Sequence, residues 1–289
     1  MITIFKTLGF CFCNIVFLLA CQQPKKNKVE LPKRQQPKTI SYHIENASLW
    51  LKNNKIDTTQ LQIVLAVNRT DSANFIKMDS VIIPDDLSGD IVYYFPFPLS
   101  VSYLKNIHKI IFFSYPTQSF ATYDKGILTH TGPTNMGRKN ALTPTGLFNA
   151  NWKAEKTNST FNDEWELLWN VNIENKLGVG WHQYALPGYP VSHSCLRLLE
   201  KDALVLYNWA NEWIMSDNDT VSVKGTPVII FGNYDFDAPK PWFKLITDPH
   251  SIDISENEIQ NQTSPFLNKI INEQKKREAF EAKNIKEIN

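Results

Sequence analysis

The stretch GWHQYALPGYPVSHSCLRLLEKDALVLYNWA, from Gly180 to Ala210, places two histidines near one cysteine and ends in a helical pattern. A cysteine attacks as a thiolate, and its ordinary pKa of about 8.5 leaves little thiolate at neutral pH without a neighbouring base. His182 can return over the Cys195 sulfur from an adjacent strand, because the loop QYALPGYPV separates the two residues. His193 lies two residues before the cysteine on the same extended chain. The spacing predicts Cys195 as a nucleophile and His182 as its base.

The segments on either side of this stretch predict a β-rich domain. Upstream, KIIFFSYPTQSFATYDKGILTHTGPTNMG, from Lys109, alternates apolar and polar residues, with turn signals at Tyr115-Pro116 and Asp124-Lys125-Gly126. This pattern predicts successive antiparallel strands joined by a tight hairpin. Downstream, GTPVIIFGNY, from Gly225, predicts a buried strand.

Between these strands, LLEKDALVLYNWANEWI predicts an amphipathic helix. Asp202 is placed for its first turn, where a carboxylate interacts favourably with the helix dipole. The apolar face of this helix is expected to carry Leu199, Ala203, Leu206, Tyr207, Ala210 and Trp213 or Ile214.

The motif SHSCLRL, Ser192 to Leu198, resembles the active-site signature of the L,D-transpeptidases, the YkuD-like family. That signature has an upstream histidine, here His182, then Ser/Thr-His-Gly-Cys, an aliphatic residue and an arginine. The turn TPTGLF, from Thr143, precedes the motif in the family's order. The resemblance runs from about Ile110 to Tyr234. It implies a fold that is mainly β with α, a β-sandwich-like catalytic domain, to which the flanking sequence adds a small N-terminal α/β module and a C-terminal helix.

The resemblance also implies a two-step acyl exchange on peptidoglycan stem peptides. Cys195 attacks the carbonyl between a diamino acid and a terminal D-residue, D-alanine leaves, and an amine of a neighbouring stem resolves the thioester. The backbone carbonyl of Gln183 orients the His182 ring, and backbone N–H groups of His193, Ser194 and Cys195 form an oxyanion hole. Such a mechanism requires no metal and no cofactor.

Near the cysteine lie one further candidate site residue and two departures from the family signature. Arg197 is placed to hold backbone or a substrate carboxylate. Ser194 stands where the family has glycine, and serine is strained there if its φ is positive. The loop from Gln183 to Val191 is shorter than the signature usually allows, which indicates a repacked loop.

The N-terminus predicts an exported lipoprotein. One lysine followed by a short apolar run describes a signal peptide over residues 1–20. Leu18-Leu19-Ala20-Cys21 resembles a bacterial lipobox, in which cleavage precedes the cysteine and the Cys21 thiol is acylated; a plain signal peptide or anchor helix is the alternative. Residues 21–40, rich in proline, lysine and glutamine, predict a flexible tether. Cys195 is then the one thiol of the mature chain, which favours a reactive role.

Two further segments flank a catalytic domain that we assign to residues 105–250. Residues 41–104 predict a small module, in which LQIVLAVNRTDSANFIKMDSVIIP resembles the second half of a LysM-type module, a binder of N-acetylglucosamine polymers; a packing subdomain is the alternative. If this module is separate, a fragment from Ile107 to Tyr234 folds by itself. Residues 251–289 predict a polar tail with a loosely docked helix that Ser264 caps.

Composition narrows the functional hypotheses. The 289 residues are 43% hydrophobic, which suffices for a core, and the net charge of +1 gives no electrostatic argument for a nucleic-acid partner. The leading hypothesis is a lipid-anchored L,D-transpeptidase of the cell envelope, facing the periplasm, with peptidoglycan and the membrane as partners. The alternatives are a cysteine hydrolase on the same fold and a non-catalytic peptidoglycan-binding lipoprotein with an inert, buried Cys195.

Overall fold

The computed structural model describes residues 33–159, 166–216 and 219–288. Residues 33–289 belong to one compact unit. The predicted signal peptide, the Cys21 lipidation site and most of the predicted tether lie outside the described residues. In the described ranges, no helix has the length and apolar character needed to cross a membrane.

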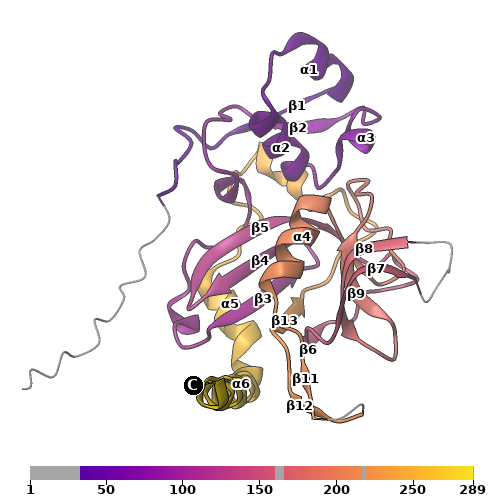
Figure 1. Cartoon of the computed structure of the whole chain (residues 1–289). Helices are drawn as coiled ribbons and strands as arrows, with labels where there is room; N and C mark the ends of the chain where they lie inside the picture. Colours follow the sequence, from indigo (N-terminus) through magenta and orange to yellow (C-terminus); the bar gives the residue numbers. More distant parts are fainter. Residues whose placement is uncertain (1–32, 160–165, 217–218, 289) are drawn as a thin grey trace, which may run out of the picture. The chain divides into compact units, whose positions relative to one another are not determined.

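The N-terminal segment forms the small α/β module that its sequence predicts. β1 (Tyr42–Glu45) and β2 (Val81–Pro84) pair antiparallel, and the helices lie between them in the sequence (Figure 1). A side-chain cap begins each helix, because the carboxylate or amide oxygen accepts a backbone N–H of the first turn. These helices are α1 (Ala47–Asn53), α2 (Thr58–Val67) and α3 (Ser72–Phe75), capped by Asn46, Asp57 and Asp71.

Within the described residues, nine strands form one mixed sheet in the order β6-β13-β3-β4-β5-β10-β9-β8-β7. The pairs β3–β13 and β9–β10 are parallel, and the other neighbours are antiparallel. The expected turn at Asp124-Lys125-Gly126 joins β4 to β5, with positive φ at Lys125 and Gly126. The strands are β3 (Lys109–Ser114), β4 (Ser119–Asp124), β5 (Ile127–Asn135), β6 (Gly146–Asn149), β7 (Lys153–Asn158), β8 (Glu166–Glu174), β9 (Val179–Gln183), β10 (Leu196–Leu198) and β13 (Pro227–Phe231).

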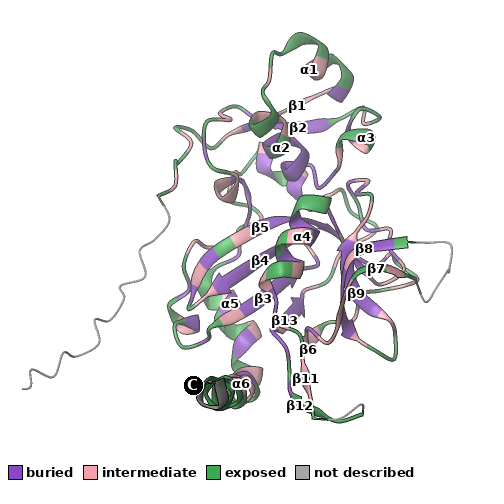
Figure 2. Cartoon of the chain, viewed as in Figure 1, coloured by how far each residue is buried: buried purple, intermediate pink, exposed green. Residues whose placement is uncertain are grey.

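The sheet curls around the main core. β6, at one edge, contacts β8, the second strand from the other edge. Phe113 of β3 and Trp181 of β9 are both fully buried, and their ring centroids lie 6.2 Å apart. Figure 2 shows the buried residues along these strands. The fold is thus mainly β with α, as the sequence predicted, and the two layers of the expected sandwich belong to one curled sheet.

The predicted helix is present as α4 (Glu200–Trp209), which packs Ala203 and Leu206 into the main core. It ends before Ile214, because Ile214–Met215 instead pairs as β11 with β12 (Val221–Val223). Asp202 lies in the first turn as expected, but it is buried and accepts a hydrogen bond from His130 Nε2 at 3.0 Å. The carboxylate therefore also ties α4 to β5.

A second core lies on the other face of the β3–β4 hairpin. Ile110 and Phe112 of β3 point into it, whereas the alternate residues of that strand face the main core. Segments from both ends of the chain complete this second core. From the N-terminal side come Phe97, Val101 and Leu104, and from the C-terminal side come Ile254, Ile259 and Ile270.

The C-terminal segment holds two helices where one was predicted. α5 (Glu256–Thr263) begins at Ser255, whose Oγ accepts the backbone N–H of Glu258. A 3-10 turn (Ser264–Phe266) then leads into α6 (Leu267–Ile288). The predicted cap at Ser264 is wrong, because this residue ends α5 and its side chain accepts no backbone N–H of α6.

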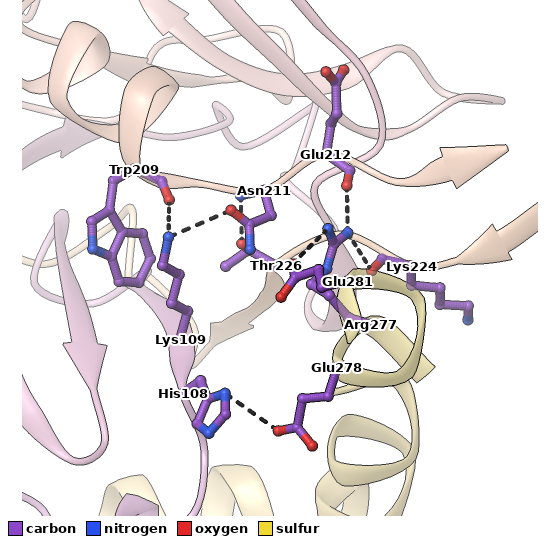
Figure 3. Close-up of polar contacts among 10 residues, drawn as sticks. All are labelled: His108, Lys109, Trp209, Asn211, Glu212, Lys224, Thr226, Arg277, Glu278 and Glu281. Atoms are coloured by element: carbon purple, nitrogen blue, oxygen red, sulfur yellow. Dashed lines mark hydrogen bonds and ion pairs between the residues drawn. The ribbon is translucent and has the colours of Figure 1, made fainter. Parts of the chain in front are cut away.

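α6 is held by specific contacts and is not loosely docked (Figure 3). The Arg277 guanidinium donates to the carbonyl oxygens of Glu212 at 2.6 Å and Lys224 at 3.2 Å. The Glu278 carboxylate lies 3.4 Å from Nδ1 of His108, the residue before β3. Because the apolar side of α6 also contributes to the second core, the helix forms an integral part of the fold.

Candidate active site

The β9–β10 pairing brings the predicted base and nucleophile to one face of the sheet. In the parallel register, Arg197 lies opposite His182 and Leu196 lies opposite Trp181. Trp181 and Leu196 are buried in the main core, so His182 and Arg197 lie on the opposite face. Cys195, two residues before Arg197, shares that face and is a diagonal neighbour of His182.

A cavity of about 230 Å³ opens on this face. Four predicted site residues, His182, His193, Cys195 and Arg197, line it. The wall is completed by Ser159, Leu167, Leu177, Gly178, Tyr184 and Ser192. The cysteine and both histidines of the opening motif therefore line one cavity.

The His182 ring is held in one tautomer. Its Nδ1 lies 2.9 Å from the backbone carbonyl oxygen of Gln183, and a carbonyl oxygen only accepts, so Nδ1 carries the hydrogen. The edge of the ring packs against Tyr184, with the ring centroids 5.9 Å apart. Burial, reinforced by the charge of Arg197, lowers the pKa of His182 to about 4. At neutral pH the free Nε2 is thus a proton acceptor.

The thiol of Cys195 is in its neutral form in this environment. Burial raises its pKa, and the backbone at Gly180 and the charge of Arg197 oppose that shift only in part. The sulfur lies 3.7 Å from the carbonyl oxygen of Gly178. If a neutral thiol attacks in a cavity that it shares with a neutral imidazole, the proton must be transferred at the moment of attack, which is general-base chemistry.

The loop that carries the predicted oxyanion donors is held by two hydroxyl groups. Thr143 Oγ1 accepts the backbone N–H of Gly137 at 2.8 Å and donates to the carbonyl oxygen of Ser194 at 2.9 Å. Ser192 Oγ donates to the carbonyl oxygen of Cys195 at 2.6 Å. The Thr-Pro-Thr-Gly motif therefore contributes a hydroxyl that supports the loop around the cysteine.

Ser194 adopts a φ of 88°, a conformation that favours glycine. Strain was expected at Ser194 if its φ proved positive, and this strain is therefore present. The hydrogen bond from Thr143 holds the Ser194 carbonyl in this strained conformation.

The short loop between His182 and Cys195 is braced by residues that the sequence did not single out. Asp71 accepts the backbone N–H of Leu186 at 2.7 Å and returns its own N–H to the Leu186 carbonyl at 3.1 Å. Thr70 Oγ1 donates to the same carbonyl at 2.8 Å. Asn135 of β5 accepts the N–H of Val191 at 3.2 Å. Motif spacing could not reveal Thr70 and Asp71, because they lie more than one hundred positions upstream.

No metal centre accompanies this site in the described part of the chain. There, no group of three or more His, Cys, Asp or Glu side chains is placed to hold an ion. His43, His108, His130 and His250 each lie within hydrogen-bond or ion-pair distance of a carboxylate outside the cavity.

The curled mixed sheet thus carries a thiol and an oriented imidazole in one cavity. Residues 108–230 match the family of L,D-transpeptidase catalytic domains, YkuD. This segment is therefore the L,D-transpeptidase catalytic domain of the chain.

Solved structures of L,D-transpeptidases resemble this chain more weakly than the family model does. An L,D-transpeptidase from Stackebrandtia nassauensis is 21% identical over 44% of this chain and 57% of its own, with a TM-score of 0.36. One from Mycobacterium smegmatis is 19% identical over 44% and 59%, with a TM-score of 0.34. L,D-transpeptidase 3 from Mycobacterium tuberculosis, in complex with a faropenem-derived adduct, is 21% identical over 44% and 61%, with a TM-score of 0.34. The chain thus spans less than two thirds of these proteins. A search of curated proteins found no match.

Proposed function

We propose that this protein is a peptidoglycan L,D-transpeptidase that uses Cys195 as nucleophile and His182 as base. The observation that carries the proposal is that both side chains line one cavity, with His182 Nδ1 hydrogen-bonded to the Gln183 carbonyl. That hydrogen bond leaves Nε2 as the atom able to accept a proton. The family match over residues 108–230 supports the reaction class.

In the proposed first step, Nε2 of His182 removes the thiol proton while the Cys195 sulfur bonds to the carbonyl carbon of the donor stem. The carbonyl π electrons move to oxygen, and backbone N–H groups of His193, Ser194 and Cys195 stabilise that charge. The carbon–nitrogen bond to D-alanine then breaks. The proton held on His182 passes to the leaving amine, and a thioester remains.

In the second step, a side-chain amine of another stem attacks the thioester, and His182 accepts its proton. The carbon–sulfur bond breaks, and the proton returns to the Cys195 sulfur. The products are a cross-linked dimer and the original thiol. Water in place of the amine gives the hydrolase alternative by the same route.

Incubation of the purified protein with a defined tetrapeptide stem, followed by intact-mass analysis, tests this function. We expect an acyl-enzyme adduct on Cys195, release of D-alanine and a cross-linked product. Cys195→Ala is the matched control and is expected to form none of them. Release of D-alanine with only hydrolysed stem identifies the hydrolase, and a folded protein with an unreactive Cys195 supports the non-catalytic alternative.

We further propose that acylated Cys21 anchors the protein to the membrane, with the domain on the periplasmic side. The support is the sequence Leu18-Leu19-Ala20-Cys21 together with the polar segment that follows it. Several acyl chains anchor firmly, since each buried methylene contributes about 0.8 kcal/mol. Cys21→Ala is therefore expected to move the protein from the membrane to the soluble fraction, or to block its processing. Unchanged size and partition in cell fractionation contradict the proposal.

Glycan binding by the N-terminal module is a second proposed activity. A LysM-type module needs a first strand and helix before the segment that resembles its second half, and β1 and α1 occupy that place. Calorimetric titration of the Cys195→Ala protein with N-acetylglucosamine oligomers tests it. We expect saturable heat, and a protein that folds normally but gives no heat indicates a packing module.

A further inference from the structure

Two arginines lie beside the loop that carries the cysteine. Gly137 forms a parallel β-bridge with Ser192, and the next residue, Arg138, donates its backbone N–H to the Ser192 carbonyl at 3.0 Å. This pairing places Arg138 next to His193. Arg197 follows the cysteine by two residues and lines the cavity.

Neither guanidinium has an ion-pair partner among the described residues. Arg138 Nε is buried and has no hydrogen-bond partner there. Arg197 stacks on the Tyr184 ring, with Cζ 4.4 Å from the centroid, a contact that leaves the N–H edge of the guanidinium available. By contrast Lys139, the residue after Arg138, pairs with Asp237 at 2.8 Å on the surface.

This arrangement has an electrostatic cost in the free protein. A buried donor without a partner is destabilising, and so is a like charge nearby. Burial lowers the pKa values of His193 and Arg197, and the Arg138 charge adds to both shifts. An anionic ligand would relieve both penalties by accepting hydrogen bonds and neutralising charge. A carboxylate suits a planar guanidinium, because its two oxygens can accept parallel hydrogen bonds.

We propose that Arg138 and Arg197 form a carboxylate-binding subsite that holds a free carboxylate of the donor stem beside the scissile bond. This inference rests on the proposed function and identifies the substrate as an unamidated acid. We expect the subsite to affect productive binding of the donor, because the subsite includes neither the thiol nor the base. Arg138 is a residue that the motif resemblance did not indicate.

Two carboxylates of a donor stem lie close to the scissile bond. One is the C-terminal carboxylate of the leaving D-residue, and the other is the side-chain carboxylate of the diamino acid. Three synthetic tetrapeptide donors separate them: the free diacid, its C-terminal amide and its side-chain amide. The amide that is processed poorly by the wild-type protein identifies the bound group.

The test compares kcat/KM of these donors for wild type, Arg138→Gln and Lys139→Gln, each as the full chain. Loss of a charge-assisted pair is expected to lower kcat/KM of Arg138→Gln by about 10- to 100-fold on the diacid, mainly through KM. The kcat/KM of wild type is expected to fall by a similar factor when one of the two amides replaces the diacid. The kcat/KM of Arg138→Gln is expected to be no lower on that amide than on the diacid. Lys139→Gln removes a neighbouring exposed cation and is expected to match wild type.

Alkylation of Cys195 by iodoacetamide, which is neutral, controls for folding and thiol reactivity, and its rate should be equal in all three proteins. Should Arg138→Gln misfold, Arg138→Lys and the wild-type comparison of the three donors still decide the question. Equal kcat/KM of wild type on all three donors overturns the subsite. A folded Arg138 variant that prefers the diacid over the amide as strongly as wild type does also overturns it. No turnover of any donor by wild type contradicts the proposed function instead.

Discussion

Replacing His182 with alanine is expected to slow acylation of Cys195 by a carbapenem about 100- to 10,000-fold at neutral pH, the range for loss of a general base. The reason is the neutral state of the thiol, whose pKa is raised by burial, so little thiolate forms without assistance. Acylation can be followed by intact mass, with circular dichroism to show that the fold is retained.

The pH dependence separates the two histidines. In wild type, the pKa of His182 is lowered to about 4, so we expect the proposed base to stay neutral and active until the pH falls to near that value. An ordinary histidine would begin to lose activity near pH 6.5. His182→Ala should recover partly in alkali, where solvent ionises the thiol, and only above the usual thiol pKa because burial raises it.

His193→Asn is the matched comparison. If His193 mainly positions the backbone donors of the oxyanion loop, its replacement slows acylation without alkaline rescue. Tryptophan fluorescence in the same buffers distinguishes an acid limb of the rate from acid unfolding. Alkaline rescue of His193→Asn, together with near-normal rates of His182→Ala at neutral pH, reverses the assignment of the two residues.

The fragment Ile107–Tyr234 is expected not to fold. It retains the sheet but loses the six apolar side chains that the N- and C-terminal segments insert into the second core. Burying a large apolar side chain contributes about 1.5 to 3 kcal/mol, so the loss is about 9 to 18 kcal/mol, compared with a typical total stability of about 5 to 15 kcal/mol. The fragment also lacks Thr70 and Asp71, which brace the loop before the cysteine.

Thermal unfolding followed by near-ultraviolet circular dichroism tests this expectation. A fragment of residues 33–289 is the control, because those residues belong to one compact unit, and it should melt cooperatively. A cooperative transition in the short fragment, with acylation of Cys195, would instead favour the boundaries at residues 41–104 and 105–250 that the sequence predicted.

Local patterns were sufficient for much of the secondary structure. Alternation and turn residues predicted β3, β4 and β5, because strand periodicity and the φ preferences of Lys125-Gly126 depend on near neighbours. Helical spacing predicted α4, but its end was missed. The β11–β12 pairing that draws Ile214 out of the helical pattern joins segments whose register no local pattern encodes.

The sequence by itself indicated the family of the catalytic domain, because the histidine, Ser-His-Ser-Cys and Thr-Pro-Thr-Gly motifs occur in the order of the family that residues 108–230 match. It did not determine how the site is held. Only the tertiary structure decided the bracing by Asp71, the support from Thr143 and the position of Arg138, whose Nε has no hydrogen-bond partner among the described residues. The physical reason is that a hydrogen bond or an electrostatic contact depends on distance in space, whereas periodicity and motif spacing record distance along the chain.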